Sequence, residues 1–125
     1  MMALEGFKVY VVTAGVPSVT FTKNGTGLSK AAVAKLGNPE YVRILFDSNE
    51  KRMAVQACDE NEEGAVKLPQ RDGVEGVRWN NKDLINTVEQ ITGFDIKGSK
   101  GFKVDGITLD EERAILFELQ KKELI

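Results

Sequence analysis

Residues 25–30 have the composition of a phosphate-binding loop, because two glycines stand before a predicted helix start whose N–H groups could face an anion. The nucleotide-binding patterns G-x-x-x-x-G-K-[ST] and G-x-G-x-x-G nevertheless do not occur in the chain. Residues 98–101, Gly-Ser-Lys-Gly, match neither pattern and are typical of a connection between elements. We therefore interpret both segments as loops.

The chain offers few groups for catalysis. It contains no histidine, which excludes imidazole acid–base chemistry and Ser-His or Cys-His pairs. Cys58 stands beside Asp59, whose charge should raise the thiol pKa, so we interpret this lone cysteine as a packing residue. The acidic runs at 59–63 and 110–112 lie in turn-like segments without the spacing of a calcium loop. We predict a non-enzymatic protein that holds no metal and no cofactor.

Lysines in the first half are the remaining candidates for a binding site, and their partner would be DNA. Residues 1–58 carry a net charge of +3 and residues 59–125 a net charge of -5. The sequence pI is only about 5.3, so DNA binding would require the lysines to gather on one face, or several copies to associate. Exposed lysines are otherwise common solubility devices. The candidate residues are Lys8, Lys23, Lys30 and Lys35.

Hydrophobic patterning in the first half predicts the order β-β-α-β-β. Ser29 can cap the helix and Gly37 can end it. We interpret residues 23–27 as a loop and residues 47–50 as a turn. The predicted strands are 7–13, 18–22, 41–46 and 52–57, and the predicted helix is 30–36.

The second half begins with an acidic linker, residues 59–75, in which no period persists. A short strand at 76–79, a helix at 82–92 capped by Asn80 or Asn81, and a strand at 102–107 follow. Residues 110–123 leave two alternatives open. A capping box at 108–111 favours a helix, whereas the continuous apolar run 114–117 favours a strand, and we prefer the strand.

Residues 1–125 fit a single compact domain, whose two halves show similar order and spacing. The glycines that end the two predicted helices, Gly37 and Gly93, are 56 positions apart, and the last strands begin near Arg52 and Arg113. We predict half-repeats at 6–58 and 76–120 joined by the linker. Chance recurrence of small elements is the alternative.

Residues 6–58 resemble the AbrB-type swapped-hairpin domain of bacterial regulators and antitoxins. The resemblance is carried by a strand at 19–21, a short helix ending in Leu36-Gly37, and a hairpin formed by 41–47 and 51–55. It implies that two such units interlock into one barrel and bind DNA through basic residues near the first hairpin. A duplicated chain would supply both units itself.

The expected fold class is α+β, with two short helices packed on antiparallel strands, as a pseudo-symmetric swapped-hairpin barrel if the halves are repeats. The expected function is a DNA-binding regulator, and the alternative is a protein-interaction or assembly module of a larger complex. Its partners would be DNA, another protein or further copies of itself. We expect a cytoplasmic location, because the chain has no apolar run long enough to span a membrane and its N-terminus lacks an export-signal pattern.

Overall fold

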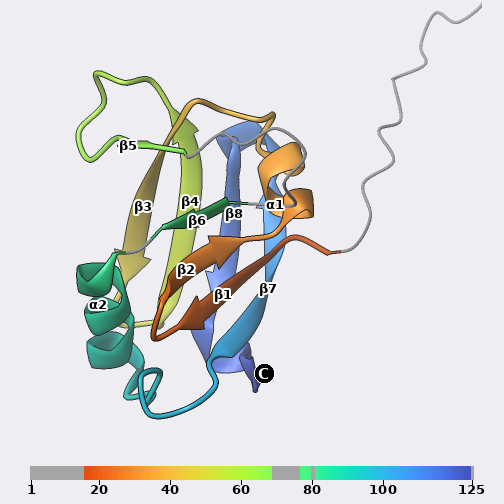
Figure 1. The fold of residues 1–125 in the computed structure, drawn as a ribbon. Helices are drawn as coiled ribbons and strands as arrows, with labels where there is room; N and C mark the ends of the chain where they lie inside the picture. The colour runs from red at the N-terminus through yellow and green to blue at the C-terminus, as the bar shows by residue number, and fades with distance from the viewer. Residues whose placement is uncertain (1–15, 69–76, 80, 125) are drawn as a thin grey trace, which may run out of the picture.

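The computed structural model describes residues 16–68, 77–79 and 81–124. Within these ranges, eight strands follow one another in a curled antiparallel sheet in the order β5-β3-β4-β8-β7-β1-β2-β6, and a ninth, β9, pairs with β7. The curl brings β1, β2 and β6 over β3, β4 and β8, while α1 and α2 lie near opposite ends of the assembly (Figure 1).

The bounds of the elements are as follows. The strands are β1 (Ser18–Thr22), β2 (Gly25–Leu28), β3 (Tyr41–Asp47), β4 (Arg52–Cys58), β5 (Val66–Lys67), β6 (Val77–Trp79), β7 (Phe102–Leu109), β8 (Ala114–Glu118) and β9 (Glu123–Leu124). The α-helices are α1 (Lys30–Lys35) and α2 (Lys82–Thr92), and two 3₁₀ turns cover Asp110–Glu112 and Leu119–Lys121.

Strand β7 belongs to both layers of the curl. Its first half pairs with β1, from Phe102 to Asp105, and its second half pairs with β8, from Gly106 to Leu109. We call β6, β2, β1 and the first half of β7 the front layer, and β3, β4, β8 and the second half of β7 the back layer. Gly106 stands at the change of layer, where a Cβ would lie 2.4 Å from Ile115 Cγ2 and 2.7 Å from Phe117 Cε1. Only glycine lets the two layers approach this closely.

The core lies between the two layers and is built from alternate residues of each strand. One set comes from the front layer and another from the back layer, and both belong to a single apolar cluster. Burial of these side chains removes the apolar face of each layer from water, which stabilises the curled arrangement. The buried strand residues are Val19, Phe21, Leu28, Phe102 and Val104 in front, and Val42, Met53, Val55, Ile115 and Phe117 behind.

Both helices begin where the sequence predicts; α2 also ends as predicted, and α1 ends one residue earlier, at Lys35. Ser29 Oγ accepts a hydrogen bond from Ala32 N–H at 3.1 Å, and the Asn81 side chain accepts one from Leu84 N–H at 3.2 Å. Gly93 ends α2 in the left-handed conformation, at a φ of 78°. These caps satisfy helix-end N–H groups and explain why short segments form helices here.

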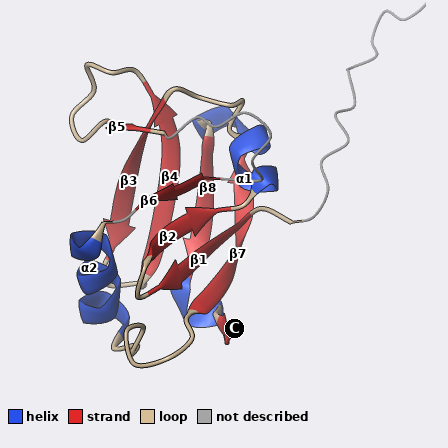
Figure 2. Ribbon diagram, viewed as in Figure 1, coloured by secondary structure: helices blue, strands red, loops and turns tan. Residues whose placement is uncertain are grey.

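The predicted fold class was wrong, because it gave the helices a larger share of the fold than they have. The described residues form a sheet-dominated, curled half-barrel, and the two short helices cover little of it (Figure 2). The predicted loop at 23–27 is reduced to a turn at residues 23–24, because Gly25–Leu28 form β2 in a tight hairpin with β1. The predicted linker also contributes to the sheet, since Val66 and Lys67 pair with β3. Backbone pairing between distant segments turned irregular-looking sequence into strands. The observed curled half-barrel takes the place of the predicted swapped-hairpin barrel.

Other elements match the predictions. Strands 18–22, 41–46, 52–57, 76–79 and 102–107 and both helices are present with small shifts at their ends. For residues 110–123 the strand alternative is confirmed at 114–118, between the two 3₁₀ turns. The predicted strand at 7–13 lies outside the described residues. No helix within the described ranges has the length and apolar character needed to cross a membrane.

Segments from the two sequence halves are joined within the one sheet. β1 pairs with β7, β2 with β6, and β4 with β8. Whether 6–58 and 76–120 descend from one duplicated unit stays a prediction.

Candidate nucleic-acid interface

The four lysines predicted from the sequence do not form one cluster among the described residues. Lys8 lies outside the described residues. Lys23 lies in the β1–β2 turn, whereas Lys30 and Lys35 are the first and last residues of α1, beyond the far end of β2. The four residues of β2 alone span about 13 Å. Lys30 and Lys35 are five positions apart, about 140° around the helix, so they point in different directions.

Other cations lie on the outer side of the front layer, which we call the front face. Arg78 pairs with Gly27, Gly27 with Thr20, and Thr20 with Lys103, so these four residues form one row across four strands. Arg78 and Lys103 are exposed at the two ends of this row. Alternation along the strands directs the row outward, since Phe102 and Val104, the neighbours of Lys103, are buried. The two central residues of the row, Gly27 and Thr20, are small, and each end of the row carries a cation.

The spacing of these cations suits the DNA backbone. Three strand separations set the Arg78 and Lys103 backbones about 14 Å apart. This is close to the width of a B-DNA major groove, about 12 Å. Gly27 leaves the centre of the row open, because the nearest atom to an added Cβ would be the Val77 carbonyl oxygen at 3.6 Å. A phosphate backbone could therefore approach the sheet without meeting a large side chain.

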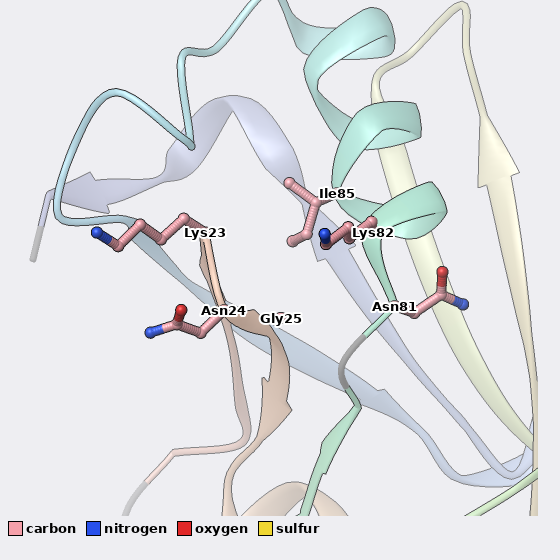
Figure 3. A pocket seen from close by; sticks show the side chains of 6 residues that line it. All are labelled: Lys23, Asn24, Gly25, Asn81, Lys82 and Ile85. Carbon is pink, nitrogen blue, oxygen red and sulfur yellow. The ribbon is translucent and has the colours of Figure 1, made fainter.

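A pocket of about 390 Å³ lies beside this row, between the β1–β2 turn and the start of α2 (Figure 3). Lys23 lies on one side of it and Lys82 on the other. Both side chains are exposed, and no ion pair of either is found among the described residues. The remaining lining residues are Asn24, Gly25, Asn81 and Ile85. The structure thus brings Lys23 together with a cation from the second half rather than with Lys30 or Lys35.

Acidic groups reduce the positive charge at one end of the front face. Lys103 Nζ lies 3.9 Å from Asp105 Oδ1, and Lys103 also pairs across the sheet with Glu123. The Lys103–Asp105 pair is about half exposed, so water and salt screen it strongly. The Arg78 side chain, at the other end, has no hydrogen bond or ion pair with another described residue. We expect the strongest attraction for an anion around Arg78, Lys23 and Lys82.

The outer side of the back layer, which we call the back face, has a different character. Leu45 pairs with Ala54, Ala54 with Leu116, and Leu116 with Ile107. We call these four outward residues the apolar row. Leu45 is 39% exposed and Ile107 54%, although both are large hydrophobic residues. Val16, 57% exposed, lies near the Ile107 end, because Gly106 N–H donates to the neighbouring Pro17 carbonyl at 2.7 Å.

Cys58 is half-buried at the end of β4 and lines a surface pocket. Burial raises the pKa of its thiol, the charges of Glu62 and Asp59 raise it further, and Arg43 opposes them. The thiolate is therefore disfavoured, in agreement with the prediction from the sequence. Within the described ranges, no three acidic or cysteine side chains come together as a metal site would require.

Sequence reasoning missed Arg78, Lys82 and Lys103. Two of them were visible as outward positions of predicted strands, and the third as the first residue of a predicted helix. Which strands lie side by side was not visible, and this alone places the three cations near Lys23.

Comparison with known protein families, with curated proteins and with solved structures gives no match. The resemblance to the AbrB-type domain stays a prediction.

Proposed function

We propose that this protein is a small, non-enzymatic DNA-binding regulator that contacts the phosphate backbone through its front face. The observation that carries the proposal is the row of Arg78, Gly27, Thr20 and Lys103, with Lys23 and Lys82 beside it. The row presents cations about one groove width apart around an open centre, which favours contact with a phosphate backbone. Because these contacts read no base edges, they would position the protein rather than select a sequence.

A cytoplasmic location is part of this proposal. DNA is the proposed ligand, and Cys58 is a free thiol in the structure, which suits a reducing compartment.

The test is fluorescence anisotropy of a labelled duplex titrated with the full chain over a range of salt concentrations. Four phosphate contacts would give a log–log salt slope of about -3.6. Replacing Arg78 or Lys23 by alanine should make this slope shallower by about 0.9 each, because each variant removes one contact. Lys35→Ala is the matched control, since Lys35 is exposed on α1 away from the front face. It should leave the slope unchanged.

Two results would overturn the proposal. One is no binding at about 50 mM salt with tens of micromolar protein. The other is a slope that falls as much in Lys35→Ala as in Arg78→Ala, because the attraction would then come from net charge and not from the front face.

A second candidate function, a protein-interaction or assembly module, rests on the back face. Its apolar row would lose exposed hydrophobic area to a protein partner, and such rimmed apolar patches commonly mark protein interfaces. Photo-crosslinking from residue 107 in the cell that makes the protein, with residue 87 on α2 as a control position, tests it. Adducts with another protein that form from residue 107 but not from residue 87 support this function. Equal adducts from the two positions, or none from either, contradict it.

A further inference from the structure

We infer that the back face binds a second copy of this chain, forming a symmetric dimer across the apolar row. This inference names the partner for the second candidate function and does not depend on DNA binding. It rests on the charges on either side of the apolar row and on the way a twofold axis would superimpose them.

The apolar row lies between two polar rows of opposite charge. On one side, Arg43 pairs with Gln56, which pairs with Ala114, and we call this the arginine row. Its net charge is +1. On the other side lies the acidic row, which contains Asp47, Arg52 and Glu118 and has a net charge of -1.

When two copies of the sheet pack face to face, the twofold axis between them can run across the strands or parallel to them. The opposite charges of the two polar rows favour one of these two axes. With an axis along the apolar row, the apolar rows of the two copies pack against each other. The arginine row of each copy then faces the acidic row of the other. Arg43 then faces Asp47 of the partner subunit, and this contact occurs twice. An axis parallel to the strands would instead set each polar row against its own copy, so that like charges meet. Charge complementarity therefore favours the first axis.

Both charged groups are available for this contact. Arg43 uses its Nε–H to donate to Gln56 Oε1 at 2.8 Å, and its two terminal nitrogens have no partner among the described residues. The Asp47 side chain is 38% exposed, although Oδ2 accepts from Arg52 at 2.6 Å and Oδ1 from Glu50 N–H at 3.1 Å. A carboxylate has further lone pairs, so Asp47 can accept an additional hydrogen bond from a guanidinium.

The groups beyond the arginine row do not reverse its charge. A pocket of about 210 Å³ lies there, and its charged lining residues are Arg43, Arg113, Asp59 and Glu62. Arg43 itself belongs to the arginine row, so the groups beyond the row carry a net charge of -1, which balances its +1 without reversing it. Within the acidic row, Lys121 Nζ lies 2.7 Å from Glu118 Oε2 and offsets its charge, so Asp47 is the carboxylate that makes the proposed contact.

The available area predicts a weak dimer. Four strands and three rows cover about 400 Å² per copy. A standard interface buries about 800 Å² per partner. We therefore expect a dissociation constant on the order of tens of micromolar.

Sedimentation equilibrium of the full chain, without DNA, tests the inference over about 5 to 500 µM, a range that brackets this constant. We expect a monomer–dimer equilibrium that Ile107→Glu or Leu45→Glu weakens at least tenfold, because a charge would enter the apolar contact. Val66→Glu is the matched control. Val66 is 38% exposed, close to Leu45 at 39%, but lies on β5 outside the row. Circular dichroism confirms that each variant is folded.

A mixing experiment tests the axis itself. Arg43→Glu alone and Asp47→Lys alone should each dimerise at least tenfold more weakly, since each sets like charges together twice. An equimolar mixture of the two variants should regain the affinity of the unchanged chain. In the mixed dimer one contact joins the two substituted positions, with their charges exchanged, and the other joins the unchanged Arg43 and Asp47. Fluorescence energy transfer between differently labelled variants reports this mixed dimer.

A monomer at every concentration up to about 500 µM overturns the inference. If residue 107 nevertheless crosslinks to another protein in the cell, the second candidate function stands and only the identity of the partner is wrong. A dimer that Ile107→Glu does not weaken, or a mixture without recovery, overturns the proposed face or the proposed axis.

Discussion

The front and back faces of the curled sheet share strand β7, yet they present opposite chemistry. In the front layer the outward residues are small or charged, with Gly27 and Thr20 between Arg78 and Lys103. In the back layer the central outward row is apolar, from Leu45 to Ile107. The inward residues of both layers are mostly hydrophobic, with Thr26 as a buried polar exception, so folding constrains the inside and leaves the two outer faces free to differ. The difference teaches that the two outer faces of one small sheet can differ in chemistry, one polar and charged and the other apolar.

The largest predicted effect is a difference in salt dependence between the contacts of the two faces. Raising salt about tenfold should weaken DNA binding by the front face about 4,000-fold, because several counterions are released on binding. The same change should weaken the back-face dimer less than about tenfold, since burial of apolar area is insensitive to screening. Anisotropy and sedimentation measured in the same buffers check this. Equal salt sensitivity of both contacts would contradict the division.

Gly106 should have the largest effect on stability, because it connects the two layers. Gly106→Ala would drive a Cβ into Ile115 and Phe117, at a cost of about 3 kcal/mol. Gly27→Ala is the control, since its Cβ would make only an ordinary contact, and the cost should stay below about 1 kcal/mol. Urea unfolding measures both. Similar values for the two variants would mean that the layers are not tightly joined at Gly106.

Glu89 should hold the loop that follows α2, next to the front layer. Its Oε2 accepts from Ile96 N–H at 2.8 Å and from Lys97 N–H at 3.2 Å, and Lys97 Nζ lies 3.2 Å from Oε1. Burial raises the pKa of Glu89, but these hydrogen bonds and the Lys97 charge outweigh burial, so the pKa lies below its ordinary value of 4.5. Glu89→Gln should cost about 1.5 kcal/mol at neutral pH.

The dependence of folding stability on pH below neutrality gives a second test of the role of Glu89. Because the pKa of Glu89 is lowered on folding, its contribution is present above pH 4.5 and is lost as the pH falls through the folded-state value. Glu89→Gln should therefore flatten the loss of stability between pH 7 and about pH 3. Glu111→Gln, in an exposed turn, is the control and should keep the slope of the unchanged chain. An unchanged slope in Glu89→Gln would contradict the assignment.

Substitution of Thr26 by valine should have the smallest effect on stability, and it should stabilise the protein rather than destabilise it. The Thr26 hydroxyl is buried on the inner side of the front layer and has no hydrogen-bond partner among the described residues. Thr26→Val replaces the hydroxyl by a methyl group of similar size, so we expect stabilisation by about 0.5 to 1 kcal/mol in urea unfolding. Thr26→Ser keeps the hydroxyl and loses a methyl group, and it should destabilise. Destabilisation by Thr26→Val would contradict the assignment of this hydroxyl as unpaired.

Most local elements could be predicted from the sequence, and the failures share one cause. Alternation at 18–22 and the cap at Ser29 are local signals, so β1 and α1 were predicted close to their observed bounds. Gly25–Leu28 contains two glycines, and only the backbone pairing of β2 with β1 on one side and β6 on the other makes it a strand. Val66–Lys67 is likewise a strand only because β3 lies beside it.

The chain by itself determined the inventory of its chemistry: a chain without histidine, one thiol whose neighbours disfavour the thiolate, and cations that had to gather if they were to bind DNA. Tertiary structure decided which cations gather. It separated Lys23 from Lys30 and Lys35, set it beside Lys82, and aligned Arg78 with Lys103. It also aligned Leu45 and Ile107, which are 62 positions apart in the chain, in one exposed row. The physical reason is that hydrophobic periodicity specifies which side of a strand faces the core, whereas the identity and register of neighbouring strands depend on long-range pairing.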